Sequence, residues 1–179
     1  MYKTATTFLK RFFKVSTIYK YGFNWSPMYR RSTAKLIHVS DDLHHVRIKI
    51  PFSYKNRNYA GSIFGGSMLS ATDPIYMIQF IQILGDDYVI WDKSASIKYK
   101  RPAKESIYAD FIVTPEEVKQ IKADVATHNE VDFTKTLHLI NEEKTIFAEV
   151  EKTLYIATKS HYKTKLKARK QKLKAIATK

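Results

Sequence analysis

The chain has 179 residues, 44% of them hydrophobic, which is enough to bury the core of one domain. It contains no cysteine, which excludes disulfide bonds, thiol nucleophiles and thiolate metal sites. The formal net charge of +14 suggests a nucleic-acid partner until the charges are divided along the chain. Residues 1–31 and 159–179 contain basic residues and no acid, whereas residues 32–158 hold all 17 acidic residues, so the body is nearly neutral.

Hydropathy argues against export and against a membrane span. Every apolar run is too short to cross a bilayer, and residues 1–30 lack the continuous apolar core of a secretory signal. We therefore expect a cytoplasmic protein.

The N-terminal segment, residues 1–30, places aromatic residues at helical spacing between basic ones. Phe8, Phe12 and Tyr19 follow this pattern, which predicts a basic amphipathic helix over residues 4–20 that Asn24 to Pro27 ends. Such a helix would cover one end of the core, or present a face to a membrane or a partner. Its lack of acids is also typical of an organellar transit peptide.

Strand-like alternation and one long apolar run define the body, residues 31–158. A strand that begins at Ala34 is predicted to turn at Asp41-Asp42 into a second strand through Ile50. The run from Met68 to Leu84 is apolar nearly all round, which predicts a buried central helix.

Later elements complete the predicted domain. Thr114 and Pro115 have the residue types that begin a helix. Four further strands are expected near residues 88–99, 107–113, 131–140 and 145–157. We therefore predict an α+β domain with a single, largely antiparallel sheet around one helix. Residues 159–179 are expected to be a solvated tail, with electrostatic contact to nucleic acid or anionic lipid as the alternative.

The stretch NYAGSIFGGSMLSATD, residues 58–73, resembles the N-x-x-G-x-x-H-G-G-x-x-x-x-x-x-D signature of the phenylacetate-pathway type of acyl-CoA thioesterases. The matching positions are Asn58, Gly61, Gly65, Gly66 and Asp73. WDKSASIKYKRPA, residues 91–103, is similar to the strand of those enzymes that ends in a Tyr-x-x-Pro turn. The resemblance covers about residues 30–158, is strongest to a poorly characterised bacterial branch, and implies a hot-dog fold.

The resemblance also implies roles for several residues. The backbone N–H of Gly65 would polarise the thioester carbonyl, and Asp73 would act as base or nucleophile. A donor of this kind typically contributes about 3 kcal/mol. Asn58 would orient the site, and Asp92 stands where family members place a serine or threonine that helps hold water.

The spacing within this motif predicts an oligomer. Gly65 and Asp73 are eight residues apart, so one continuous helix would separate them by about 12 Å. Two helices that run antiparallel across a two-fold axis would bring Gly65 of one chain near Asp73 of the other. We therefore expect a homodimer, with a tetramer left open.

Two departures from the motif leave alternatives open. Phe64 replaces the motif's histidine, and Pro74 disfavours helical geometry at Asp73. Asp73 would then be the N-cap of a new helical segment that starts with Pro74. Asp92 would equally pair with Lys93 or lie on the surface.

These residues predict an acyl-CoA thioesterase, with a non-catalytic acyl-CoA or fatty-acyl binding protein of the same fold as the alternative. The acyl chain would lie against Met68 and Met77, beside Phe64 and Gly66. Arg57, Lys98 and Arg101 would meet CoA phosphates, or else be ordinary solvated cations. No cofactor and no metal site are implied.

Overall fold

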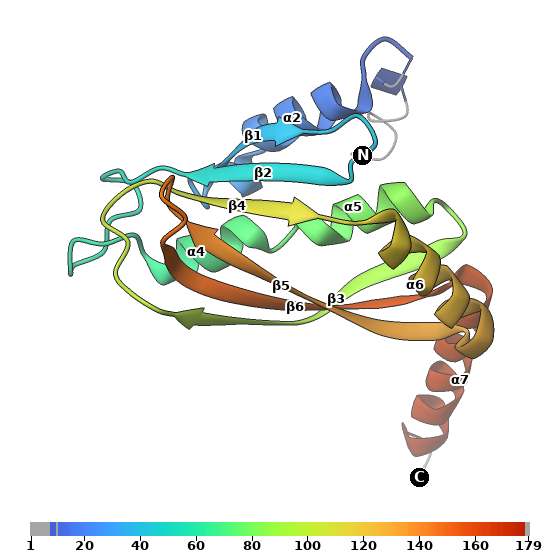
Figure 1. Ribbon diagram of the computed structural model, residues 1–179. Coiled ribbons are helices and arrows are strands. Elements are labelled where there is room, and N and C mark those ends of the chain that lie inside the picture. The colour runs from blue at the N-terminus through green and yellow to red at the C-terminus, as the bar shows by residue number, and fades with distance from the viewer. Residues whose placement is uncertain (1–7, 10, 178–179) are drawn as a thin grey trace.

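The computed structural model of the protein describes residues 8–9 and 11–177, with side chains up to residue 173. It contains one six-stranded antiparallel sheet in the order β1-β2-β4-β5-β6-β3 (Figure 1). The strands are β1 (Lys35–Val39), β2 (His45–Ile50), β3 (Tyr88–Tyr99), β4 (Ile107–Ile112), β5 (Glu130–Ile140) and β6 (Ile146–Thr158). The predicted α+β class and the order of its elements are confirmed.

The central helix consists of two segments, α4 (Gly65–Thr72) and α5 (Ile75–Leu84). Pro74 separates them because it has no N–H to donate to the helical ladder. Asp73 nevertheless keeps helical dihedral angles, φ −55° and ψ −54°, and ends α4, while Pro74 occupies the position before α5. The alternative in which Asp73 caps a new helix is therefore wrong. Gly85 ends α5 with φ 84°, a left-handed value that glycine adopts easily.

The sheet curves around α4 and α5, and its inner face supplies the core (Figure 1). Strand residues of alternating position face the helices, as Val150, Leu154 and Ile156 do from β6, all fully buried. Phe80 of α5 packs edge-on against Phe133 of β5, with ring centroids 5.5 Å apart. The helix is therefore wrapped as its all-round apolar character predicts.

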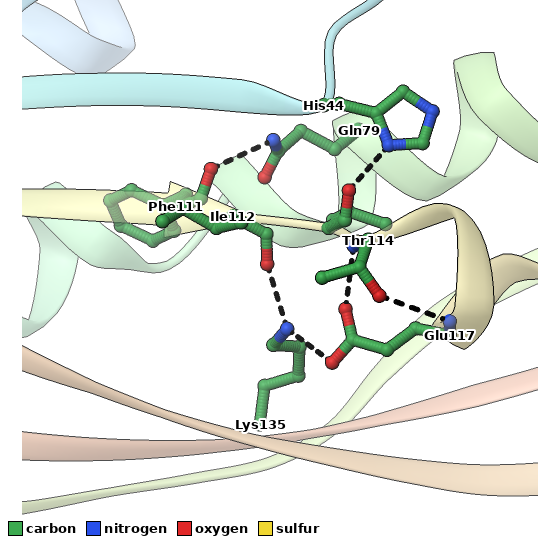
Figure 2. Close-up of polar contacts among 8 residues, drawn as sticks. His44, Gln79, Phe111, Ile112, Thr114, Glu117 and Lys135 are labelled. Carbon is green, nitrogen blue, oxygen red and sulfur yellow. Dashed lines mark hydrogen bonds and ion pairs between the residues drawn. The ribbon is translucent and has the colours of Figure 1, made fainter.

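The sheet is less regular between β4 and β5, where Tyr108 pairs with Ile140 in the antiparallel register. The Lys135 side chain of β5 bridges these two strands, and the Gln79 side chain of α5 holds β4 to the central helix (Figure 2). Gln79, which is buried, donates to the carbonyls of Leu43 and Phe111 at 2.7 and 3.2 Å. Lys135 donates to the Ile112 carbonyl at 2.7 Å and pairs with Glu117. These contacts satisfy backbone groups that the ladder leaves open.

Helix α6 (Pro115–His128) begins as its sequence predicts. The Thr114 hydroxyl accepts from the Glu117 N–H at 3.2 Å, and the Glu117 carboxylate accepts from the Thr114 N–H at 2.8 Å. This reciprocal capping box satisfies two N–H groups at the helix start (Figure 2).

The N-terminal helix lies later in the chain than predicted. Helix α2 spans Val15–Trp25 and is followed by the short α3 (Pro27–Arg30). Residues 13 and 14 are not helical, so a continuous helix over residues 4–20 is wrong, and residues 1–7 and 10 of that prediction lie outside the described residues. Val15, Tyr19 and Phe23, spaced four apart, pack on the core and fix α2 there.

Helix α7 (Lys159–Ala177) projects from the lower edge of the body, opposite α2 (Figure 1). The side chains from Lys163 to Leu173 are all exposed, as expected of a solvated tail, but the segment is helical. Lysine, alanine, leucine, glutamine and arginine are good helix formers, which accounts for the difference. Within the described residues, no helix has the length and hydropathy needed to cross a bilayer.

Candidate active site

A buried lysine joins two of the predicted site residues. The Lys152 ammonium group lies 2.8 Å from Asp73 Oδ1 and 2.9 Å from Asp92 Oδ1, and its side chain is fully buried. The Asp73 side chain is 55% exposed and that of Asp92 is 25% exposed. The cluster thus runs from the core to the surface and carries one cation for two carboxyl groups.

Three elements bring this cluster together. Lys152 occupies an inward position of β6, between the buried residues Val150 and Leu154. Asp92 lies on the neighbouring β3, where the register shifts between Asp92 and Ser94. Asp73 comes from the end of α4, at the interruption of the central helix. The predicted pairing of Asp92 with Lys93 is wrong, because Lys93 contacts Asp132 instead.

The electrostatics differ between the two ends of the cluster. Burial raises the pKa of Asp92 above the ordinary value of an aspartate; the hydrogen bond and charge of Lys152 oppose this rise, and the charge of Asp73 adds to it. Asp73 is the more exposed carboxylate, so water and a ligand can reach it.

The loop before α4 holds the start of the helix. Asn58 makes reciprocal hydrogen bonds with Ser62, as its side-chain nitrogen donates to the Ser62 hydroxyl at 3.1 Å and its oxygen accepts from the Ser62 N–H at 3.1 Å. The Ile63 N–H donates to the Ala103 carbonyl at 2.8 Å. Asn58 therefore shapes the loop, and it is not among the partners of the Asp73 cluster.

The first turn of α4 presents backbone donors. The N–H groups of Ser67 and Met68 donate to the Phe64 carbonyl, so those of Gly65 and Gly66 precede the first intrahelical hydrogen bonds. A side chain at Gly65 would collide with the end of Tyr99, and one at Gly66 with the ring of Phe64. Both glycines therefore permit close packing, and the Tyr99 hydroxyl lies against the start of the helix.

The predicted substrate contacts divide into two groups. The backbones of Arg57 and Ile63 form an isolated antiparallel β-bridge. Arg101 lies two residues before Ala103, whose carbonyl accepts from the Ile63 N–H. Both exposed arginines therefore lie near the start of α4. Lys98 instead pairs with Glu149 at 3.5 Å. Its β3 position opposes Glu149, on the sheet face that points away from the helix.

The methionines predicted to line an acyl pocket pack in or against the core. Met68 is buried and Met77 is half-buried. A cavity of about 10 Å³ lies between α5 and α2 and is too small for an acyl group; Ile75, Ile78, Tyr19 and Phe23 are among its lining residues.

A larger cleft, of about 590 Å³, lies on the outer side of the sheet beside α7. Trp91, Tyr155 and Lys165 line it, and among the predicted site residues Asp92 does. Trp91 and Tyr155 are opposite one another in the register, on the face away from the central helix. The start of α4 and Asp73 therefore lie outside this cleft.

Lys152 is the residue that sequence reasoning missed. One signal was present: a lysine interrupts the inward-facing series Val150, Leu154 and Ile156. A cation at such a position requires a buried partner. Among the described residues, no group of three or more histidine, aspartate or glutamate side chains is arranged to hold a metal ion.

Comparisons with known proteins agree with this architecture. PA5026 of Pseudomonas aeruginosa, a protein of unknown function described as a probable thioesterase, superposes with a TM-score of 0.70 at 16% identity, over 79% of this chain and 95% of that one. OLEI01261 of Chlorobaculum tepidum, of unknown function, gives 0.64 at 15% identity, over 80% and 94%. The thioesterase HI1161 of Haemophilus influenzae gives 0.57 at 10% identity, over 78% and 88%.

These likenesses establish the hot-dog fold and a distant structural similarity to probable thioesterases. None of the curated proteins matches the chain significantly. A family model described as "Domain of unknown function (DUF4442)" matches residues 19–156. The chain therefore belongs to the DUF4442 family.

Proposed function

We propose that this protein hydrolyses an acyl-CoA thioester. The observation that carries the proposal is the cluster of Asp73, Lys152 and Asp92 in a hot-dog fold. Asp73 ends a helix that starts with two glycines. Hydrolysis needs a group that accepts a proton from water and a donor for the developing oxyanion. A carboxylate and a helix N-terminus supply these two functions.

In the proposed reaction, Asp73 removes a proton from water as the oxygen attacks the thioester carbonyl. The Gly65 N–H stabilises the negative charge that develops on the carbonyl oxygen, and the Tyr99 hydroxyl lies close enough to Gly65 to assist. The C–S bond then breaks, and the proton held by Asp73 passes to the CoA thiolate. The products are a carboxylic acid and free CoA.

Lys152 would position the base. Its ammonium group binds Asp73 Oδ1, which leaves Oδ2 to accept the proton of water. It also offsets the repulsion between the two carboxylates. If Asp73 acted as a nucleophile instead, the intermediate would be an anhydride between Asp73 and the acyl group. Single-turnover hydrolysis in ¹⁸O-labelled water distinguishes the two mechanisms, because label in the protein indicates the anhydride.

A dimer would assemble the site. Gly65 and Asp73 lie at opposite ends of α4, so one carbonyl cannot meet both within one chain. Strand β3 is twelve residues long and forms one edge of the sheet, and Ser94 to Ser96 on it are exposed. Such an edge readily pairs with another strand. Pairing through β3 of two copies would extend the sheet and place their central helices side by side.

The test is steady-state hydrolysis of short-chain to long-chain acyl-CoA substrates, followed by release of free CoA. The purified protein should turn over at least one substrate, and Asp73→Asn should lower kcat by at least about a hundredfold. Asp86→Asn is the matched control, since Asp86 is an exposed acid outside the site that pairs with Lys159 at 3.9 Å. Equal rates for the parent and Asp73→Asn would refute the assignment.

Two observations favour the second candidate, a non-catalytic acyl-CoA or fatty-acyl binding protein. Lys152 already occupies one oxygen of Asp73, and Phe64 stands where the motif has a histidine. This alternative predicts no turnover, together with acyl-CoA affinity that Asp73→Asn leaves unchanged. Calorimetric titration with a non-hydrolysable thioether analogue separates the two candidates.

A further inference from the structure

Large apolar side chains are exposed in an unusual concentration near the N-terminus. Six of them, all more than half exposed, occur within residues 8–28: Phe8 (60%), Phe12 (68%), Phe13 (55%), Tyr21 (51%), Trp25 (75%) and Met28 (60%). Tyr21 and Trp25 lie on one face of α2 with ring centroids 5.8 Å apart, and Phe8 and Phe12 are 5.5 Å apart. Exposed apolar side chains gathered in this way mark an interaction surface. We call residues 8–9 and 11–31 the N-terminal face.

The opposite side of α2 explains why these side chains cannot turn inward. Phe23 packs edge-on against the buried Tyr29, with ring centroids 5.2 Å apart. Asn24 donates to the Leu36 carbonyl and accepts from the Leu36 N–H, at 3.0 and 2.8 Å. The helix is therefore fixed to β1 by one face, and the aromatic face is held toward solvent.

The charge of this surface is of one sign. Residues 1–31 contain no acid, and Arg11, Arg30 and Arg31 of the N-terminal face are exposed. Lys14 is also exposed, but Asp41 from the β1–β2 turn pairs with it at 3.1 Å. The partner must therefore accept both aromatic side chains and positive charge.

We propose that the N-terminal face docks on a bilayer surface that contains anionic lipid. Tryptophan, tyrosine and phenylalanine beside arginine match the boundary between acyl chains and anionic headgroups. A second copy of the chain would bring like charges together, which opposes pairing through this face. Single-stranded nucleic acid is bound in basic grooves, whereas these aromatics are exposed on α2 and in the segment before it, and α2 lies at the edge of the molecule (Figure 1).

The full-length protein permits a direct test. The chain contains two tryptophans, Trp25 and Trp91, so a Trp91→Phe background makes Trp25 the single reporter. Vesicles of equal parts phosphatidylcholine and phosphatidylglycerol should shift its emission to the blue, and brominated acyl chains should quench it. Pure phosphatidylcholine vesicles should bind far more weakly, and salt should weaken binding to the anionic vesicles.

Substitutions assign the binding to this surface. Phe12→Ala combined with Trp25→Ala, followed by cosedimentation, should weaken partition into anionic vesicles by about tenfold or more. Tyr54→Ala is the matched control, because Tyr54 is 81% exposed and lies outside the N-terminal face. It should bind like the parent. Unchanged thermal unfolding of all variants confirms that they are folded.

Five results would overturn the proposal. The first three are no binding to anionic vesicles, equal binding by the double variant, and loss of binding only when Lys167, Arg169 and Lys170 of α7 are changed to glutamine. The fourth is a change in oligomeric mass caused by Trp25→Ala, which would assign the face to a second copy. Binding of single-stranded RNA that depends on Trp25, without vesicle binding, would likewise contradict the choice of partner.

Discussion

Replacing Lys152 with methionine tests the cluster that organises the candidate site. The change preserves an unbranched side chain but leaves Asp73 and Asp92 without their shared cation. Removing one partner of a buried ion pair typically costs about 3–5 kcal/mol. Because the Asp73 side chain is 55% exposed and Asp92 is 25% exposed, water replaces part of the lost interaction. We expect a loss near the lower end, about 3 kcal/mol of unfolding free energy at neutral pH.

The pH dependence of this loss provides a second check. Burial already raises the pKa of Asp92, and Lys152 opposes the rise, so the variant should raise that pKa further. A carboxyl group whose pKa is higher in the folded state binds more protons when folded. Its contribution to stability therefore falls as pH rises through the folded-state pKa. The penalty of Lys152→Met should be larger at neutral pH than at about pH 5.

Urea unfolding at both pH values measures the effect. Lys93→Met is the matched control, because Lys93 pairs with Asp132 on the exposed face, where such pairs contribute about 1 kcal/mol or less. Adding Asp92→Asn to Lys152→Met should restore part of the stability. A loss below about 1 kcal/mol for Lys152→Met, or the same loss at both pH values, would refute the reasoning.

Three further predictions concern other parts of the molecule. Hydrogen bonds from Lys165 and Tyr155 hold the pKa of Glu130 at about 2, so the stabilising effect of this carboxylate is lost as pH falls toward that value. Glu130→Gln should therefore flatten the pH dependence of thermal unfolding between about pH 5 and pH 2. Equal slopes for the parent and the variant would contradict this. Tyr99→Phe removes the hydroxyl beside Gly65 and should lower kcat by about tenfold, while thermal unfolding stays unchanged. An unaltered kcat would exclude the Tyr99 hydroxyl as a donor to the oxyanion. Thr114→Ala breaks the capping box of α6 and should cost about 1 kcal/mol in urea unfolding, whereas no loss would show the cap to be dispensable.

The sequence was sufficient to predict elements whose signals are local. Strand β3 has the predicted bounds, Tyr88–Tyr99, because alternation and flanking turn residues define it. The start of α6 was recognisable because Thr114 and Pro115 satisfy helix-end requirements within a few residues. Gly85 was likewise recognisable as the end of the central helix, because glycine favours the backbone conformation at that position.

Features that depend on tertiary contacts were not predictable to the same degree. Residues 8–25 carry apolar side chains on more than one face, so periodicity alone did not show that Val15, Tyr19 and Phe23 would be the ones to pack. Lys152 lies 79 residues from Asp73 along the chain, and only the pairing of β6 with β3 brings it to both acids. The roles of Gly65, Asp73 and Asn58 in catalysis stay predictions.

Mixed dimers test the central claim most directly. Gly65→Pro removes the proposed oxyanion donor at the first position of α4, where the proline backbone fits a helix and Phe64 already has the extended ψ of 130° that precedes proline. The proline ring displaces the end of Tyr99 in the same chain, so this variant inactivates the Gly65–Tyr99 half of the site as a unit. Neither Gly65→Pro nor Asp73→Asn alone should hydrolyse acyl-CoA. In a hybrid that pairs one subunit of each, one site keeps Gly65 from one chain and Asp73 from the other, and turnover should return to about half of the parent's. Hybrids of the correct mass that stay as inactive as either variant would contradict the account.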